Sequence, residues 1–153
     1  MQFRDNYWFL SNFYICNIQL ELEGKKCHFT SAEAAFQAQK NLSVCDKFAL
    51  IKPLEAKKLG AKIKITTPDW DSYRLYAMAN ALHAKFDQNK GLLIALKCIK
   101  DEIVEDNFWG DTYWGRCKGE GKNMLGKMLM FIRDHDNDLV SLKFYIENTL
   151  LAE

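Results

Sequence analysis

The sequence is poor in the residues that interrupt regular structure, since it has only two prolines and eight glycines among its 153 residues. It also shows no internal repeat, low-complexity tract or linker, so nothing divides it into several domains. No apolar run approaches the about 20 residues of a membrane-spanning helix, and the N-terminal residues do not resemble a secretory signal. We therefore expect a single domain over residues 1–153, no membrane partner and a cytoplasmic location.

Neither sign of charge dominates, because 21 basic residues oppose 20 acidic ones and leave a net charge of +1. Such a chain has no overall field to hold a nucleic acid backbone, so any anionic ligand must meet a local cluster of charges. The five cysteines are scattered without a C-x-x-C pair, and the three histidines are isolated from other metal ligands. We expect reduced thiols, no metal and no cofactor.

Periodicity and capping signals predict a mainly helical α+β fold with a small N-terminal β-hairpin. Residues 15–22 alternate between apolar and polar and turn around Gly24 to pair with residues 27–29. Thr30 followed by Glu33 forms a capping-box pattern for a helix over about 31–41, and Pro53 and Gly60 bracket a second helix. Further helices are expected over about 69–86, 91–100, 122–133 and 139–151, and short strands over 63–66 and 103–105.

Glu33, Gln37 and Lys40 stand at positions i, i+4 and i+7, so they lie within about 20 degrees of one another on one helical face. If that face lines a cleft, a carboxylate and an amine converge there. If it faces water, the three residues are ordinary surface residues. Spacing alone favours the second interpretation, because Glu33 already has a capping role and Lys40 suits the negative end of the helix dipole.

The segment 106–121, DNFWGDTYWGRCKGEG, has no helical or strand periodicity and is rich in aromatic, acidic and glycine residues. Its rings could stack on a flat base while carboxylates such as Glu105 and Asp111 contact a sugar. Alternatively, Trp109 and Trp114 fold back and fill a gap in the core.

Gly119 and Gly121 precede the start of a predicted helix. Backbone N–H groups at such a start can bind a phosphate, although a plain entry from loop to helix is the alternative. The spacing differs from that of a nucleotide-binding P-loop, and Asn123 stands where a magnesium-binding hydroxyl would be required. Nucleoside-triphosphate hydrolysis is therefore excluded.

Several motifs occur in order between about Phe9 and Arg133. They are FLSNFY (9–14), SAEAAFQAQK (31–40), AKKLG (56–60), WD (70–71) with Arg74 and Met78, AKF (84–86), Glu105 followed by Asp111 and Trp114-Gly115, and GKNMLGK (121–127). Together they resemble the NADAR family, which has a YbiA-like, mainly helical single-domain fold. The resemblance implies a hydrolase that cleaves the C–N bond of a ribose N-glycoside.

This resemblance implies two classes of substrate: phosphorylated intermediates of riboflavin biosynthesis, and ADP-ribosylated guanine, which would make ADP-ribosylated DNA or RNA a partner. It further implies functional roles for Glu33, Trp70 and Asp111, with Lys40 as another candidate. We expect Glu33, Asp111 and Lys40 to be catalytic. Residues expected to bind the substrate are Trp70, Trp114, Asn12, Phe13, Arg74, Gly121 and Asn123. The alternative function is a non-catalytic module that binds ADP-ribose or NAD and needs the rings but not the carboxylates.

Overall fold

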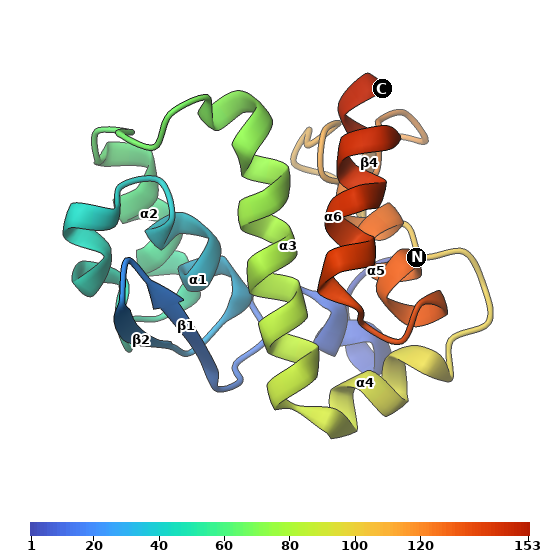
Figure 1. The fold of residues 1–153 in the computed structure, drawn as a ribbon. Coiled ribbons are helices and arrows are strands. Elements are labelled where there is room, and N and C mark those ends of the chain that lie inside the picture. The colour runs from blue at the N-terminus through green and yellow to red at the C-terminus, as the bar shows by residue number, and fades with distance from the viewer. The chain divides into compact units, whose positions relative to one another are not determined.

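The computed structural model describes residues 1–153 and comprises two compact units. The first unit is Asn12–Asn89, and the second combines Met1–Ser11 with Lys90–Glu153. Helices predominate in both units and the strands are short, which confirms the expected mainly helical α+β class (Figure 1). The expectation of a single domain stays a prediction. No helix has the length and apolar content that crossing a bilayer requires.

The predicted hairpin is confirmed in the first unit. Strands β1 (Ile18–Leu22) and β2 (Lys25–Phe29) pair antiparallel, with Leu22 opposite Lys25. Glu23 and Gly24 form the two-residue connection, and both have positive φ angles, of 50° and 79°. This is the backbone conformation that a tight hairpin turn requires and that glycine adopts most readily.

Helix α1 (Ala32–Ala38) is buried along its whole length. Its alanines leave room for close neighbours, and it packs against the hairpin, α2 and α3 (Figure 1). The expected cap at Thr30 is wrong by one residue, because the Ser31 side chain accepts the hydrogen bond from the Ala34 N–H. The Thr30 hydroxyl instead donates to the Ile51 carbonyl, at 2.9 Å.

A 3₁₀ segment η2 (Leu42–Phe48), which the sequence analysis did not predict, leads to helix α2 (Pro53–Lys62). Pro53 occupies the first turn of α2 as predicted, but Gly60 lies inside the helix and not past its end. The strand expected over 63–66 is wrong. That stretch is an extended connection in which the N–H groups of Thr66 and Thr67 both donate to the Lys40 carbonyl.

The long predicted helix is confirmed as α3 (Trp70–Gln88), which buries apolar residues at helical spacing, including Leu75, Met78, Leu82 and Phe86. This stripe forms the centre of the first unit, because α1 and β1 both pack against α3 (Figure 1).

The second unit contains η1 (Asp5–Leu10), α4 (Lys90–Lys97), α5 (Met124–Asp134), α6 (Leu139–Asn148) and η3 (Leu150–Ala152). Two short strands, β3 (Asp106–Asn107) and β4 (Arg116–Cys117), pair in parallel. The strand expected over 103–105 is wrong, because those residues are buried but the ladder starts only at Asp106. Helix α4 also ends earlier than predicted, at Lys97.

Candidate functional site

A buried polar pair lies on α1 in the first unit. The side chains of Glu33 and Gln37 are only 8% and 7% exposed, and Gln37 Nε2 donates to Glu33 Oε1 at 2.9 Å. The interpretation that this face meets water is therefore wrong for both residues. Because a buried carboxylate loses several kcal/mol of hydration, about that much must be recovered from its partners. Burying the Glu33 carboxylate therefore costs hydration free energy that a glutamate on the surface would keep.

Gln37 owes its position to a glycine on the neighbouring helix. A Cβ atom at Gly60 would overlap Gln37 Oε1, so only glycine lets α2 approach α1 this closely. Gln37 Oε1 is buried and has no hydrogen-bond partner in the protein. A buried acceptor without a donor is uncommon in folded proteins, and such atoms often mark places where a ligand or water binds.

Lys40 follows α1 and lies close enough to Glu33 to interact with its charge. Its side chain is half-buried, and Nζ donates to the Gly60 carbonyl at 3.2 Å. Burial lowers the pKa of Lys40, and the nearby Glu33 carboxylate opposes that shift. The amine therefore loses its proton at lower pH than an exposed lysine does, which is the change that makes a lysine nucleophilic.

Aromatic rings lie next to this polar pair. Phe36, between Glu33 and Gln37 on α1, packs against Trp70 at the start of α3, with 5.5 Å between the ring centroids. The Trp70 ring is in turn 6.4 Å from Tyr73. Arg74, on the same turn of α3, donates from Nε to the Asp71 carbonyl at 3.1 Å. The three rings of Phe36, Trp70 and Tyr73 therefore provide surfaces on which a flat ligand can stack.

Asn12, at the start of the first unit, contacts the same helix as the polar pair, and Phe13 follows it in the chain. The Asn12 carbonyl accepts the Glu33 N–H at 3.0 Å, and Asn12 Nδ2 approaches the Met78 sulfur at 3.5 Å. Asn12 Oδ1 is a second buried acceptor without a partner in the protein. Phe13 lies beneath Lys57, whose Nζ is 5.9 Å from the ring centroid.

In the second unit, Asp111 organises the loop between β3 and β4. Its Oδ1 accepts the N–H groups of Tyr113 and Trp114, at 3.0 and 2.9 Å, in an Asx-type turn. Asn107 braces the same loop through hydrogen bonds to the Asp111 backbone at 2.8 and 3.1 Å. Trp109 is 58% exposed, so the idea that it fills a gap in the core is wrong, whereas Trp114 is half-buried.

The start of α5 does not offer a phosphate site of the kind considered above. The N–H groups of residues 122–125 donate to carbonyls of residues 112–115. Asn123 is 1% exposed and uses both ends of its amide, donating to the Ile103 carbonyl and accepting from the Glu105 N–H. In this structure Gly121 and Asn123 therefore shape the loop, and the backbone amides beside them are already occupied.

The predicted site residues thus fall into two groups. The first unit holds Glu33, Lys40, Trp70, Asn12, Phe13 and Arg74, and the second holds Asp111, Trp114, Gly121 and Asn123. The sequence analysis did not assign site roles to Phe36, Gln37 or Gly60. The i, i+4 spacing of Gln37 from Glu33 was the available signal, but spacing does not reveal which neighbouring helix covers that face.

Comparison with known proteins identifies relatives over most of the chain. The NADAR domain matches residues 2–135. N-glycosidase YbiA of Escherichia coli (strain K12) is 32% identical over 137 residues, which covers 85% of this chain and 82% of that protein. A Vibrio vulnificus protein named riboflavin biosynthesis protein VVA0006 is 30% identical over 138 residues, covering 85% of this chain and 36% of its own length.

The fold agrees with these relationships. The NMR structure of the E. coli protein YbiA superposes with a TM-score of 0.73 at 30% identity, covering 88% of this chain and 81% of that chain. Since the matched relatives include proteins named N-glycosidases, the expected class of hydrolase acting on N-glycosyl compounds is confirmed. The order of the motifs, the match over residues 2–135 and the shared fold agree, so this chain belongs to the NADAR domain family.

Proposed function

We propose that this protein hydrolyses the C–N bond that joins the anomeric carbon of a phosphorylated or ADP-linked ribose to the nitrogen of a base. The observation that carries the proposal is the buried Glu33 carboxylate, fixed by Gln37 and close to the half-buried amine of Lys40. The adjacent Phe36 and Trp70 rings supply a surface on which a base or a sugar can stack.

Breaking this bond builds positive charge on the sugar and negative charge on the departing nitrogen. A fixed carboxylate next to the sugar stabilises the first charge and can take a proton from the attacking water. The water oxygen bonds to the anomeric carbon as the C–N bond breaks, and the departing nitrogen takes the proton that Glu33 received, so the base leaves in its neutral form and Glu33 is ionised again. Glu33 is our candidate for this role, because its orientation is set by a hydrogen bond inside the protein.

Lys40 supports a second route to the same products. Its uncharged amine attacks the anomeric carbon and expels the base, the sugar ring opens to an imine, and water then cleaves the imine to return the lysine. The lowered pKa of Lys40 supports this route, because a larger fraction of the amine is uncharged at neutral pH. The two routes differ in whether a covalent intermediate forms.

The carboxylate role is tested by Glu33→Gln, which retains the shape and the capacity to hydrogen-bond but removes the charge. We expect turnover to fall by about 100-fold or more while circular dichroism is unchanged. Glu55→Gln, on the exposed face of α2, is the matched control and should retain the parental rate. A near-parental rate for Glu33→Gln would remove this residue from the mechanism.

Asp111→Asn tests the second predicted acid without dismantling its loop. The asparagine Oδ1 can still accept the two backbone N–H groups that Asp111 now holds, so the substitution separates charge from loop structure. A loss of about 100-fold would assign Asp111 a catalytic charge. An unchanged rate would leave it with the structural role alone.

Borohydride trapping decides between the two routes. Reduction in the presence of substrate should leave a sugar-sized mass on the peptide that contains Lys40 if the imine forms, and Lys40→Arg should abolish the adduct. The exposed Lys58 is the internal control, since it should stay unmodified. Turnover without any adduct would leave the carboxylate route in place.

The substrate class is tested by separate incubations with an ADP-ribosylated guanine oligonucleotide and with phosphoribosylamino-pyrimidine intermediates, with release of the base followed by mass spectrometry. We expect one of the two to be cleaved. The alternative of a binding module predicts a different result: calorimetry would detect ADP-ribose binding while both glycosides stay intact after prolonged incubation.

A further inference from the structure

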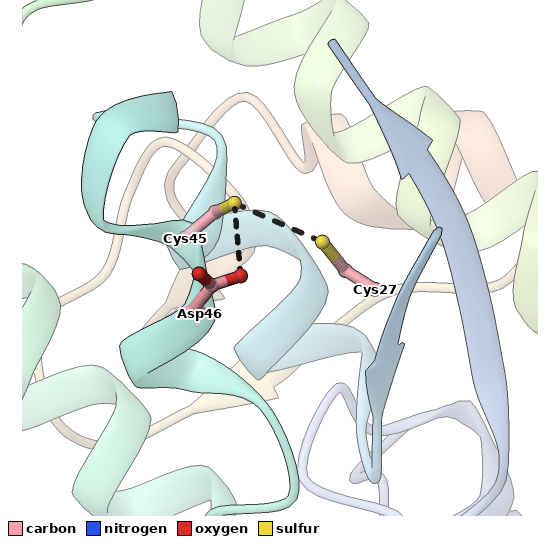
Figure 2. Close-up of side chains that lie close together, drawn as sticks. All are labelled: Cys27, Cys45 and Asp46. Atoms are coloured by element: carbon pink, nitrogen blue, oxygen red, sulfur yellow. Dashed lines mark hydrogen bonds between the residues drawn. The ribbon is translucent and has the colours of Figure 1, made fainter. Parts of the chain in front are cut away.

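A second cluster of chemically reactive side chains lies in the first unit, outside the residues assigned to hydrolysis. Cys27 on strand β2 and Cys45 on η2 point toward each other, with 3.7 Å between their sulfur atoms (Figure 2). Asp46, the next residue on η2, places its Oδ1 4.0 Å from the Cys45 sulfur (Figure 2). The three ligand atoms all lie within 4.8 Å of one another.

The distance between the two sulfur atoms matches that between two thiolates on a tetrahedral zinc ion. A Zn–S bond of about 2.3 Å places two thiolates on the same zinc about 3.8 Å apart, because that is the edge of the tetrahedron. The observed distance between Cys27 and Cys45 is 3.7 Å. A thiolate and a carboxylate oxygen on zinc are about 3.6 Å apart by the same construction. Asp46 Oδ1 is 4.0 Å from the Cys45 sulfur and within 4.8 Å of both sulfurs, so the exposed Asp46 side chain must move toward the thiols by up to about 1.2 Å.

The surroundings favour a metal over an isolated pair of thiols. Cys27 and Cys45 are 5% and 2% exposed, whereas the Asp46 side chain is 70% exposed. The two sulfur atoms therefore lie on the buried side of the cluster, and the carboxylate lies on the side that meets water. Asp46 Oδ2 is held by Lys25 Nζ at 3.0 Å, which orients the carboxylate and leaves Oδ1 on the side of the thiols.

We propose that Cys27, Cys45 and Asp46 form a zinc site, with a water molecule as the fourth ligand. Two thiolates and one carboxylate suit Zn²⁺, whereas Mg²⁺ and Ca²⁺ prefer ligands that are all oxygen. The ion would join β2 to η2, two segments whose ligands are 18 positions apart along the chain. The site concerns the stability of the first unit and does not depend on the proposed hydrolysis.

Metal binding must release protons from the thiols. Burial and the hydrogen bond with Cys27 raise the pKa of the Cys45 thiol to about 11. The metal-free thiol is therefore protonated at neutral pH, and zinc must displace that proton before the sulfur can bind. Zinc affinity should accordingly fall as the pH is lowered.

The test uses the full chain, reduced and treated with a chelator, and titrated with Co²⁺ as a spectroscopic substitute for zinc. We expect a thiolate-to-cobalt charge-transfer band that saturates at one metal per chain and disappears when Zn²⁺ is added. Loss of a residue that only hydrogen-bonds to a metal ligand lowers metal affinity by about 10- to 100-fold. Cys27→Ser and Cys45→Ser each remove a ligand itself, so each should lower the Co²⁺ affinity by more than that. Cys98→Ser, at an exposed cysteine outside the cluster, is the matched control and should retain the band.

Alkylation of the unaltered protein tests the site without relying on a variant that folds. Because Cys27 and Cys45 are buried without metal as well, the alkylation is carried out at a urea concentration that opens the metal-free protein; there Zn²⁺ should protect both thiols from iodoacetamide, and a chelator should remove the protection. Cys98 should react equally under both conditions. The proposal is overturned if the charge-transfer band is absent or survives Cys45→Ser, or if the two thiols are protected only after oxidation, which would indicate a disulfide.

Discussion

The fully buried Lys85 on α3 should make the stability of this protein increase with pH in the alkaline range. Its side chain is 0% exposed, and its Nζ lies 5.7 Å from the centroid of Tyr14 and 5.4 Å from that of Phe86. Burial lowers the pKa of Lys85 to about 8, with a smaller opposing effect from Cys16. The ordinary value for the lysine side chain is 10.5.

The sign follows from proton counting. Between pH 8 and pH 10.5 the folded protein has largely lost the Lys85 proton, whereas the unfolded chain still holds it. Because the unfolded state binds more protons, the free energy of unfolding rises with pH across this window. A difference of 2.5 pKa units, from 10.5 to 8, corresponds to about 3–4 kcal/mol at about 1.36 kcal/mol per unit, of which about 3 kcal/mol is gained between pH 7.5 and pH 10.5.

The perturbation is Lys85→Met, which retains an unbranched chain and removes the titrating amine. Urea denaturation from pH 7.5 to pH 10.5 would give the free energy of unfolding for both proteins. The parental value minus the variant value should rise by about 3 kcal/mol over this range, whatever the variant costs at neutral pH. This difference between the two proteins removes the contribution of every other group that titrates in the same way in both.

Two controls make the result specific. Burial raises the pKa of the Cys16 thiol and Lys85 opposes this shift, so the comparison should be repeated in a Cys16→Ser background. Lys58→Met, on the exposed side of α2, is the matched surface control for the same substitution. A difference between the parent and Lys85→Met that stays flat would refute the argument from burial.

Gly60→Ala should destabilise the protein by about 1–3 kcal/mol, because the new methyl group overlaps Gln37. Gly91→Ala, the matched control, should be neutral or stabilising by up to about 1 kcal/mol, because no atom lies within 4 Å of the added Cβ. Urea midpoints would measure both changes, and equal midpoints would contradict the packing argument. Asn123→Ala removes both side-chain hydrogen bonds that hold the segment before β3, and we expect a loss of about 2–4 kcal/mol by chemical denaturation, while a loss below about 0.5 kcal/mol would show that they contribute little. If Lys40 attacks as the free amine, single-turnover rates should rise with pH to a midpoint below 10.5, and Lys40→Arg should remove that rise.

Local signals predicted the elements whose stabilising interactions are themselves local. The hairpin was predictable because Gly24 provides the backbone conformation of its turn, and α3 because its apolar residues repeat at helical spacing over 19 positions. Where a residue with a local signal forms a hydrogen bond to a remote part of the chain instead, the predicted boundary was wrong by a residue or more. Thr30 lost the capping role because its hydroxyl bonds to the Ile51 carbonyl.

Around the candidate site, the local features of α1 were likewise predicted correctly, and those that depend on remote residues were predicted incorrectly. The sequence placed Glu33, Gln37 and Lys40 on one helical face, but their periodicity favoured exposure to water. Tertiary packing buries Glu33 and Gln37, because the neighbouring elements cover α1 and Gly60 allows α2 to approach it. The same segment of sequence on an isolated helix would hold its carboxylate in water.

The sequence by itself thus determined the family, the order of the helices and the position of the hairpin turn, because motifs and backbone preferences act over a few residues. The tertiary structure decided which polar groups are buried and which meet, because burial depends on neighbours that are remote along the chain. The shifted pKa of Lys85 and the approach of Cys27 to Cys45 both arise in this way.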